Sequence, residues 1–332
     1  MAAVTLVSFL LPAAACAGGE FAGSTPPDDA RAWLTRIHAA ANTGNYRGTM
    51  VFSASGAMSS SRVWHYCVGD QTFEKLESLD GLRKNIYRHN DDVHTLWPQT
   101  RTAVVEKRST LAGWQTTPQA VEPRVLEQYQ LRREGESRVA GRDADVFLLE
   151  PRDTLRYAQR LWADQATGLM LRADVLALGP ERAVLESAAF SEVEIGVKPQ
   201  PKTVTQAVAS LDGYRVVRPR QQRTRLEDEG WVLTKPVAGF NLTGCIKRQL
   251  EATRQDPRAP DAVVQAVFSD GLAHVSLFIE PFDPQRHRDQ AQAHLGATAT
   301  VTVRRQDHWI TAVGDAPMAT LRLLTEAIER RR

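Results

Sequence analysis

Residues 138–171 constrain the fold more than any other part of the chain, because they alternate short apolar runs with turn residues. Residues 146–149 are an apolar run that stops just before Pro151, as expected for a buried strand. Residues 157–162 are rich in aromatic and branched side chains, and Gly168 then offers the positive φ that a hairpin loop requires. The stretch therefore predicts four β-strands joined by turns.

The preceding part of the chain predicts a helix followed by a β-meander. A helical pattern covers residues 28–42, with Asp28 or Asp29 as its N-cap. From residue 46 the period changes to two, which predicts strands at residues 46–53, 61–68, 72–78, 83–88, 93–97 and 102–106. Further strands are predicted at residues 174–178 and 188–195, and a short helix at Val125, Leu126, Tyr129 and Leu131. Because a long antiparallel sheet tends to curl, we expect a large curled domain over residues 24–197.

A second, smaller domain is predicted after two prolines in residues 198–202, which interrupt both helix and strand. Residues 198–229 are expected to be a linker, and residues 230–332 the small domain. Its predicted strands lie at residues 241–247, 262–268, 273–279, 297–304 and 308–313. A last helix is predicted from about Pro317, with Asp315 as its N-cap, an apolar stripe of Met318, Leu321, Leu324 and Ile328, and arginines 330–332 at its end.

Several motifs occur in a fixed order. They are R-V-A-G-R at residues 138–142, P-R-D at 151–153, R-Y-x-x-R-L-W-x-D at 156–164, and the turns L-D-G at 79–81 and S-D-G-L at 269–272. In these motifs the chain resembles the MucB/RseB family of periplasmic regulators over nearly its whole mature length. The motif residues, expected to be mainly structural, are Asp80, Gly81, Gly141, Arg142, Arg152, Asp153, Arg156, Tyr157, Trp162, Asp164, Asp270 and Gly271. Arginines in residues 138–160 are expected to lock strands through bidentate pairs with nearby aspartates, while recognition of anionic lipid or peptide stays open.

The resemblance implies an α+β, mainly antiparallel β fold. Its large domain would be a half-open β-barrel like those of LolA and LolB, with helices in its mouth, followed by a small β-sheet and helix domain. The resemblance also implies binding to the periplasmic region of a membrane-spanning anti-sigma factor of RseA or MucA type. This binding would protect the anti-sigma factor from site-1 proteolysis and so negatively regulate sigma-E, and lipopolysaccharide or acyl lipid would relieve it. A homodimer is compatible with this resemblance.

The N-terminus predicts export. Residues 2–15 are apolar and are followed by small residues, as in a signal peptide cleaved near Ala17, which makes residues 1–17 the signal peptide and the periplasm the expected compartment. No Lys or Arg precedes the apolar run, and Cys16 leaves a lipidated alternative open. Three cysteines exclude a disulfide framework, and a net charge of +2 does not indicate nucleic-acid binding.

Two groups of residues are candidates for binding a partner or a lipid. The first is a basic segment, Arg215, Arg218, Arg220, Arg223 and Arg225, which is either a solvated linker or an anion-binding strip. The second is Trp64 and Tyr66, which share one face of the strand at residues 61–68. Since neither face of that strand is cleanly polar, both faces are expected to be covered by core, helix or ligand.

The chain shows no pattern of catalytic residues. A G-x-S-x-G elbow, an H-E-x-x-H helix, a P-loop and a G-x-G-x-x-G turn are all missing from the sequence. His287 and His294 lie close in sequence in a predicted loop and are weak candidates for binding a metal ion. We therefore expect a binding protein that needs no cofactor and no metal. The alternatives are a periplasmic lipid or lipoprotein carrier of LolA type and, less well supported, a periplasmic hydrolase.

Overall fold

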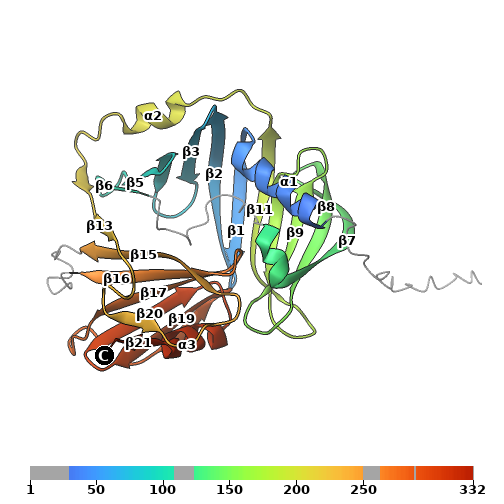
Figure 1. Cartoon of the computed structure of the whole chain (residues 1–332). Helices are drawn as coiled ribbons and strands as arrows, with labels where there is room; N and C mark the ends of the chain where they lie inside the picture. The colour runs from blue at the N-terminus through green and yellow to red at the C-terminus, as the bar shows by residue number, and fades with distance from the viewer. Residues whose placement is uncertain (1–29, 108–122, 250–261, 288, 332) are drawn as a thin grey trace, which may run out of the picture.

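The structure is a computed structural model that describes residues 30–107, 123–249, 262–287 and 289–331. These residues form a twelve-stranded sheet, a seven-stranded sheet and a two-stranded ribbon. Figure 1 shows the large sheet mainly in blue and green and the smaller sheet in orange and red. The predicted signal peptide and the predicted cap of the first helix lie outside the described residues.

The large sheet is a meander in two halves. Strands β1 to β6 pair in sequence order, strands β7 to β11 do the same, and β1 pairs with β11 where the halves meet. Among the described residues the edge strands of this sheet are β7 and β12, which do not pair with each other, so the sheet stays open. The predicted half-open, mainly antiparallel α+β fold is therefore confirmed. Its strands are β1 (Tyr46–Ala54), β2 (Ala57–Val68), β3 (Gln71–Ser78), β4 (Asn85–His89), β5 (Asp92–Trp97), β6 (Thr102–Lys107), β7 (Tyr129–Val139), β8 (Arg142–Pro151), β9 (Ala158–Asp164), β10 (Met170–Leu176), β11 (Val184–Ile195) and β12 (Arg215–Val217).

The six strands predicted between residues 46 and 106 are all present, with ends that differ by four residues or fewer. The short helix predicted from Val125, Leu126, Tyr129 and Leu131 is wrong in part. Val125 and Leu126 lie in a 3-10 helix, η1 (Pro123–Glu127), but Tyr129 and Leu131 lie on β7. Both of these side chains are buried, and they alternate along β7 with the exposed Gln130. The spacing of the four residues fits a helix, but pairing with β8 makes the second half a strand.

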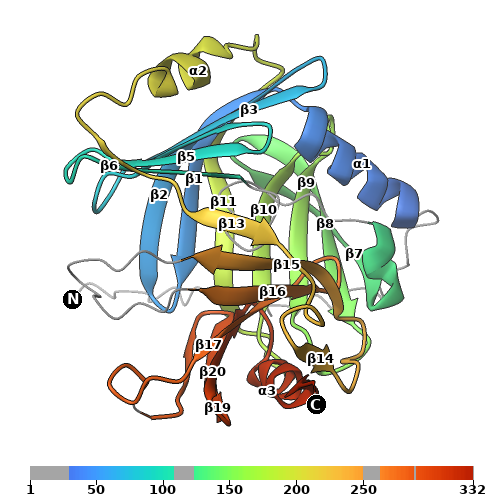
Figure 2. The same ribbon diagram turned by 60° about the vertical axis from the view of Figure 1, so that its left-hand side comes forward.

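Two helices cover parts of the large sheet (Figure 2). Helix α1 (Ala30–Thr43) buries Leu34 and Ile37 in a cluster that includes Phe147 and Leu161 of β8 and β9. Helix α2 (Lys202–Val208) buries Val204 against aromatic side chains of β2 to β4. Each fully buried aliphatic side chain stabilises the fold by about 1.5–3 kcal/mol, so both helices are held mainly by these apolar contacts.

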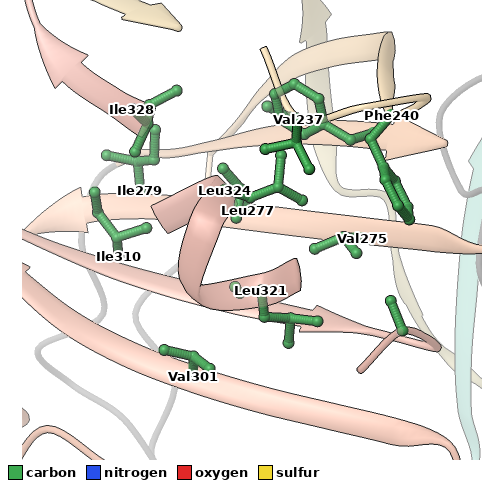
Figure 3. Close-up of a cluster of buried hydrophobic side chains, with 14 of the residues drawn as sticks. Val237, Phe240, Val275, Leu277, Ile279, Val301, Ile310, Leu321, Leu324 and Ile328 are labelled. Carbon is green, nitrogen blue, oxygen red and sulfur yellow. The ribbon is translucent and has the colours of Figure 1, made fainter. Parts of the chain in front are cut away.

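The smaller sheet carries the third helix, α3 (Met318–Ala327), on one face. Figure 3 shows Leu321 and Leu324 of α3 beside Val275 and Leu277 of β17 in one apolar cluster. The sheet runs in the order β13-β15-β16-β17-β20-β19-β18. Its strands are β13 (Arg220–Arg223), β15 (Asn241–Gln249), β16 (Val263–Ser269), β17 (His274–Pro281), β18 (Gln292–Leu295), β19 (Thr298–Arg305) and β20 (His308–Gly314). The five predicted strands are present; β13 and β18 were not predicted.

The end of the chain differs from the prediction in two ways. Asp315 is not the N-cap of α3: the cap position is Pro317, with no side-chain cap hydrogen bond. Asp315 instead accepts a hydrogen bond of 2.6 Å from the backbone N–H of His274, and desolvation raises the pKa of its carboxyl group. The helix also stops at Ala327, because Ile328 enters β21 (Ile328–Arg330), which pairs with β14 (Trp231–Leu233). Ile328 is thus buried from a strand rather than from the helical stripe.

Candidate partner-binding site and the junction between the sheets

The five arginines of the basic segment lie along an extended stretch that joins the two sheets. Arg215 is on β12, which pairs in parallel with β6 of the large sheet, whereas Arg220 and Arg223 are on β13, which pairs with β15 of the small sheet. All five arginines, including Arg218 and Arg225, are exposed. Figure 1 shows this stretch descending from α2 to β13. Both sheets hold the backbone, while the guanidinium groups face solvent, where an anionic partner can reach them.

Trp64 and Tyr66 have different environments although both are on β2. Tyr66 is 2% exposed and belongs to the apolar cluster under α2, and burial raises the pKa of its hydroxyl group. Trp64 is only partly buried, and the Lys75 ammonium lies 4.4 Å from the centroid of its ring. Tyr66 therefore has a packing role, and Trp64 is the one of the pair that a ligand can reach.

A polar cavity of about 460 Å³ lies close to Trp64, and it is lined by residues of β2, of the end of β3 and of the loops that follow β3 and β5. Arg62 connects the two features, because its guanidinium carbon lies 5.9 Å from the centroid of the Trp64 ring. The cavity is lined by Arg62, Glu77, Ser78, Leu79, Gly81, Arg83 and Gln99. Two arginines against one carboxylate make its charge favour an anionic group such as a phosphate.

The two sheets meet at a buried ion pair between Arg156 and Asp270. Both side chains are fully buried, and Arg156 Nη1 donates to Asp270 Oδ2 at 2.9 Å. Arg156 also donates to both carboxylate oxygens of Asp153, each at 3.0 Å, and to the backbone carbonyl of Ala238 at 2.6 Å. Tyr129 donates to Asp270 Oδ2 at 3.1 Å. This network satisfies a buried guanidinium and a buried carboxylate from opposite sides of the junction, as buried charges require.

The turn that carries Asp270 also inserts an apolar side chain into the large domain. Leu272 is 1% exposed and belongs to the cluster of Leu34, Ile37 and Phe147 rather than to the core of its own sheet. Gly271 has φ +101°, and a Cβ atom there would lie 3.1 Å from the side chain of Arg124. The S-D-G-L motif therefore makes the turn itself a contact between the two sheets.

A second contact joins the sheets at the loop after β18. The backbone N–H of Gly296 donates to Ser55 Oγ at 2.7 Å, and that of Ala297 donates to Glu186 Oε1 at 2.9 Å. Burial raises the pKa of the Glu186 carboxyl group. Gly296 has φ +60°, and a Cβ there would lie 2.6 Å from the Glu186 side chain, so a larger residue at this position would be strained. The junction thus has at least two separate anchor points.

Most of the remaining motif residues hold strands and turns of the large sheet. Arg142 binds Asp164 through two hydrogen bonds of 2.7 and 3.2 Å, which joins β8 to the end of β9. Trp162 packs under the guanidinium group of Arg172, at 4.5 Å. Asp80 accepts hydrogen bonds from Ser60. Gly81 and Gly141 have φ of +66° and +76°. Arg152 is exposed, and Tyr157 is partly buried.

Replacing Asp164 by asparagine tests this role. Desolvation alone would raise the pKa of the Asp164 carboxyl, but hydrogen bonds from Arg142 and Thr167 outweigh it and lower the pKa below 3.8. A carboxyl with a lowered pKa stabilises the fold at pH values above 3.8 and loses this effect as the pH falls further. We expect Asp164→Asn to cost about 1–3 kcal/mol near pH 7. Urea unfolding of both proteins should show the difference shrinking below pH 4; a pH-independent difference would contradict the assignment.

The sequence did not predict several residues of the junction. Glu186, Gly296 and Tyr129 lie in no motif that we singled out, and Thr320 of α3 donates to the backbone carbonyl of Leu155 at 2.5 Å. The one available signal was that Arg156 and Asp270 are charged residues inside strongly patterned motifs. Their pairing joins positions 114 residues apart, which a local pattern does not reveal.

Among the described residues, the histidines of the small sheet do not form a metal site with other ligands. Within the described ranges, no group of three or more His, Cys, Asp or Glu side chains is placed to hold a metal ion. His287 has its Nδ1 atom 3.0 Å from the backbone nitrogen of Asp283 and its Nε2 atom 3.4 Å from Glu280, and His294 lies on β18. No helix of the described part of the chain is long and apolar enough to cross a bilayer.

The half-open antiparallel sheet, its smaller partner sheet and the buried junction between them define a two-part β protein whose exposed charges and cavity suit binding. The chain belongs to the MucB/RseB family. The family model for the MucB/RseB N-terminal domain matches residues 29–208, and the model for the C-terminal domain matches residues 225–329. The family resemblance of the motifs is thus confirmed.

Named relatives and solved structures agree with this assignment. The sigma factor AlgU regulatory protein MucB of Pseudomonas aeruginosa is 32% identical over 322 residues, 90% of each chain. The sigma-E factor regulatory protein RseB of Escherichia coli K12 is 22% identical over 93% of this chain and 92% of its own. The complex structure of P. aeruginosa MucA/MucB matches with a TM-score of 0.69 and 29% identity, over 92% of this chain and 99% of that one. MucB in complex with MucA(peri) matches with a TM-score of 0.68 and 28% identity, over 92% and 100%.

Proposed function

We propose that this protein binds the periplasmic region of a membrane-spanning anti-sigma factor and so negatively regulates a sigma factor of the sigma-E (AlgU) type. The observation that carries the proposal is the match to MucB as solved with MucA, which covers 92% of this chain and so includes both sheets. The exposed arginines of the basic segment, the Trp64 face and the polar cavity support a role in binding. The proposal also includes a location and a role: the protein acts in the periplasm, and its binding shields the anti-sigma factor from site-1 proteolysis.

The same proposal includes a lipid signal. The cavity beside Trp64 has two arginines for the phosphate of lipopolysaccharide or of an acyl lipid. A ligand that prefers the unbound protein lowers its affinity for the partner, and the partner lowers affinity for that ligand by the same factor. Lipid binding would therefore release the anti-sigma factor to the protease.

Calorimetric titration of the mature chain with the periplasmic segment of the anti-sigma factor tests the central claim. We expect binding, a slower cleavage of the segment by the site-1 protease when the chain is present, and weaker binding when lipopolysaccharide is added. Sedimentation of the free chain reports at the same time whether it is a homodimer. A folded sample that gives neither heat nor co-elution at concentrations on the order of tens of micromolar, weaker than typical specific binding, contradicts the proposal.

The basic segment can be tested separately. Changing Arg215, Arg218, Arg220, Arg223 and Arg225 to serine is expected to weaken partner binding by roughly tenfold or more, because each exposed ion pair contributes about 0.2–1 kcal/mol. The dependence of affinity on salt should also become less steep. The control variant, Arg31→Ser with Arg152→Ser, removes exposed arginines outside the segment and should leave affinity near its original value. An unchanged affinity of the five-residue variant at low salt would show that the segment is a solvated linker.

A further inference from the structure

Cys67 lies at one end of a chain of polar side chains on β2, β3 and β4. Its Sγ atom is 3.4 Å from Nε2 of His65, and Nδ1 of His65 is 3.0 Å from Oε1 of Glu74. Arg88 donates to the other oxygen of Glu74 at 2.8 Å. A thiol, an imidazole and a carboxylate therefore stand in sequence, each within reach of the next.

The surroundings of His65 fix its ring and its proton. The residue is 3% exposed, and its ring stacks on that of Tyr46 with 5.0 Å between centroids. Since a carboxylate only accepts hydrogen bonds, Glu74 holds the proton on Nδ1 of His65 and leaves the lone pair of Nε2 facing the thiol. This is the arrangement of nucleophile, base and orienting carboxylate by which proteins activate a thiol.

The thiol of Cys67 needs such a base to react. It donates its proton to the backbone carbonyl of Asn42 at 2.9 Å, and burial raises its pKa, so the free thiolate is scarce without proton transfer. The residue is nevertheless partly exposed, so a small reagent can reach it. Cys245 offers an internal comparison, because it is 8% exposed and burial raises the pKa of its thiol to about 11.

We propose that Cys67 is a site of oxidation by peroxides, with His65 as its general base and Glu74 as a positioning residue. In the reaction, the S–H bond of Cys67 rotates from the Asn42 carbonyl toward His65, Nε2 of His65 takes the thiol proton, and the sulfur attacks one peroxide oxygen. The O–O bond breaks, and the leaving oxygen takes the proton back from His65. One thiol and one hydrogen peroxide thus give one sulfenic acid and one water. The oxidisable group lies where the end of α1 meets β2.

Hydrogen peroxide applied to the full chain at pH 7, with a sulfenic-acid trapping reagent and peptide mass spectrometry, tests the proposal at each cysteine separately. We expect Cys67 to be trapped at least about tenfold faster than Cys245, since exposure and an adjacent base favour reaction. In His65→Gln the rate at Cys67 should fall roughly tenfold to 100-fold, the lower range of general-base catalysis. Glu74→Gln, which keeps the shape of the side chain, should lower the rate by a smaller factor.

The rate at Cys245 shows whether each variant remains folded, because unfolding would expose this buried thiol and raise its rate. In variants where the rate at Cys245 is unchanged, a slower Cys67 supports the proposal. Equal rates at the two cysteines of the unaltered chain would overturn it. An unchanged rate at Cys67 in both His65→Gln and Glu74→Gln would overturn it as well.

Discussion

Replacing Arg156 by alanine is expected to lower the free energy of unfolding by about 3–5 kcal/mol, as for a buried ion pair that loses one partner. The side chain is fully buried and donates to Asp153, Asp270 and the carbonyl of Ala238. Without it, Asp270 is left as a buried charge whose Oδ2 atom keeps only the hydrogen bond from Tyr129 among the contacts described above. Urea unfolding followed by tryptophan fluorescence measures the loss as a shift of the midpoint.

The neighbouring Arg152 provides the control. It lies four residues away and is exposed, so Arg152→Ala should change stability by no more than about 0.5 kcal/mol. Arg156→Lys is expected to recover little, because an ammonium group cannot fork between two carboxylates as a guanidinium does. Equal midpoints for Arg156→Ala and Arg152→Ala would refute the role of the pair. A rise in the radius of gyration of the folded Arg156→Ala protein would show that the two sheets separate.

The strands of the large sheet could be predicted because their signal is local. Side chains that alternate along residues 46–106 report a period of two whatever they pack against, and four of the five turns between these strands carry glycine or asparagine. Strands β12 and β13 are too short to carry that signal: β12 has three residues, Arg-Val-Val, and β13 has four, Arg-Gln-Gln-Arg. They are strands because β6 and β15 offer free edges, and this depends on the tertiary structure alone.

The ion pairs of the arginines could also be predicted only where both partners are close in sequence. Pairing between arginines and nearby aspartates of the large domain was expected, and Arg142 with Asp164 and Arg156 with Asp153 do pair. Arg156 nevertheless also binds Asp270, in the other sheet, which no local pattern of the sequence indicated. Among the candidate ligand residues, Tyr66 could not be distinguished from Trp64 by sequence, because α2, which is far away in the chain, covers only the first of them completely.

One tripeptide occurs twice in the chain, in two different environments. Asp-Gly-Leu occurs at residues 80–82 and again at residues 270–272, and in both copies the glycine has positive φ, as the sequence predicts for a turn. Leu82 is 76% exposed, whereas Leu272 is 1% exposed. Local sequence therefore determines the turn, while the neighbouring domain determines whether its leucine is buried.

Replacing Leu272 by alanine is accordingly expected to cost about 2–5 kcal/mol, the usual range for a buried leucine that leaves a cavity. The cavity would open in the cluster of Leu34, Ile37 and Phe147, so the small domain would lose this apolar contact with the large domain. Leu82→Ala is the matched control, since it makes the same change in the same tripeptide at an exposed position. Its unfolding midpoint should stay close to that of the unaltered chain, and equal costs for the two variants would contradict the prediction.

The two junction substitutions should not be additive. Asp270 accepts hydrogen bonds from the backbone N–H groups of Leu272 and Ala273 at 2.9 and 2.7 Å, so the turn that seats the leucine is held by the carboxylate that Arg156 binds. Once either substitution has loosened the turn, the second substitution removes less stabilising free energy than it would on its own. We therefore expect Arg156→Ala with Leu272→Ala to cost less than the sum of the single variants, by about 0.5–3 kcal/mol. Strict additivity in a double-mutant cycle would mean that the ion pair and the apolar contact join the sheets independently.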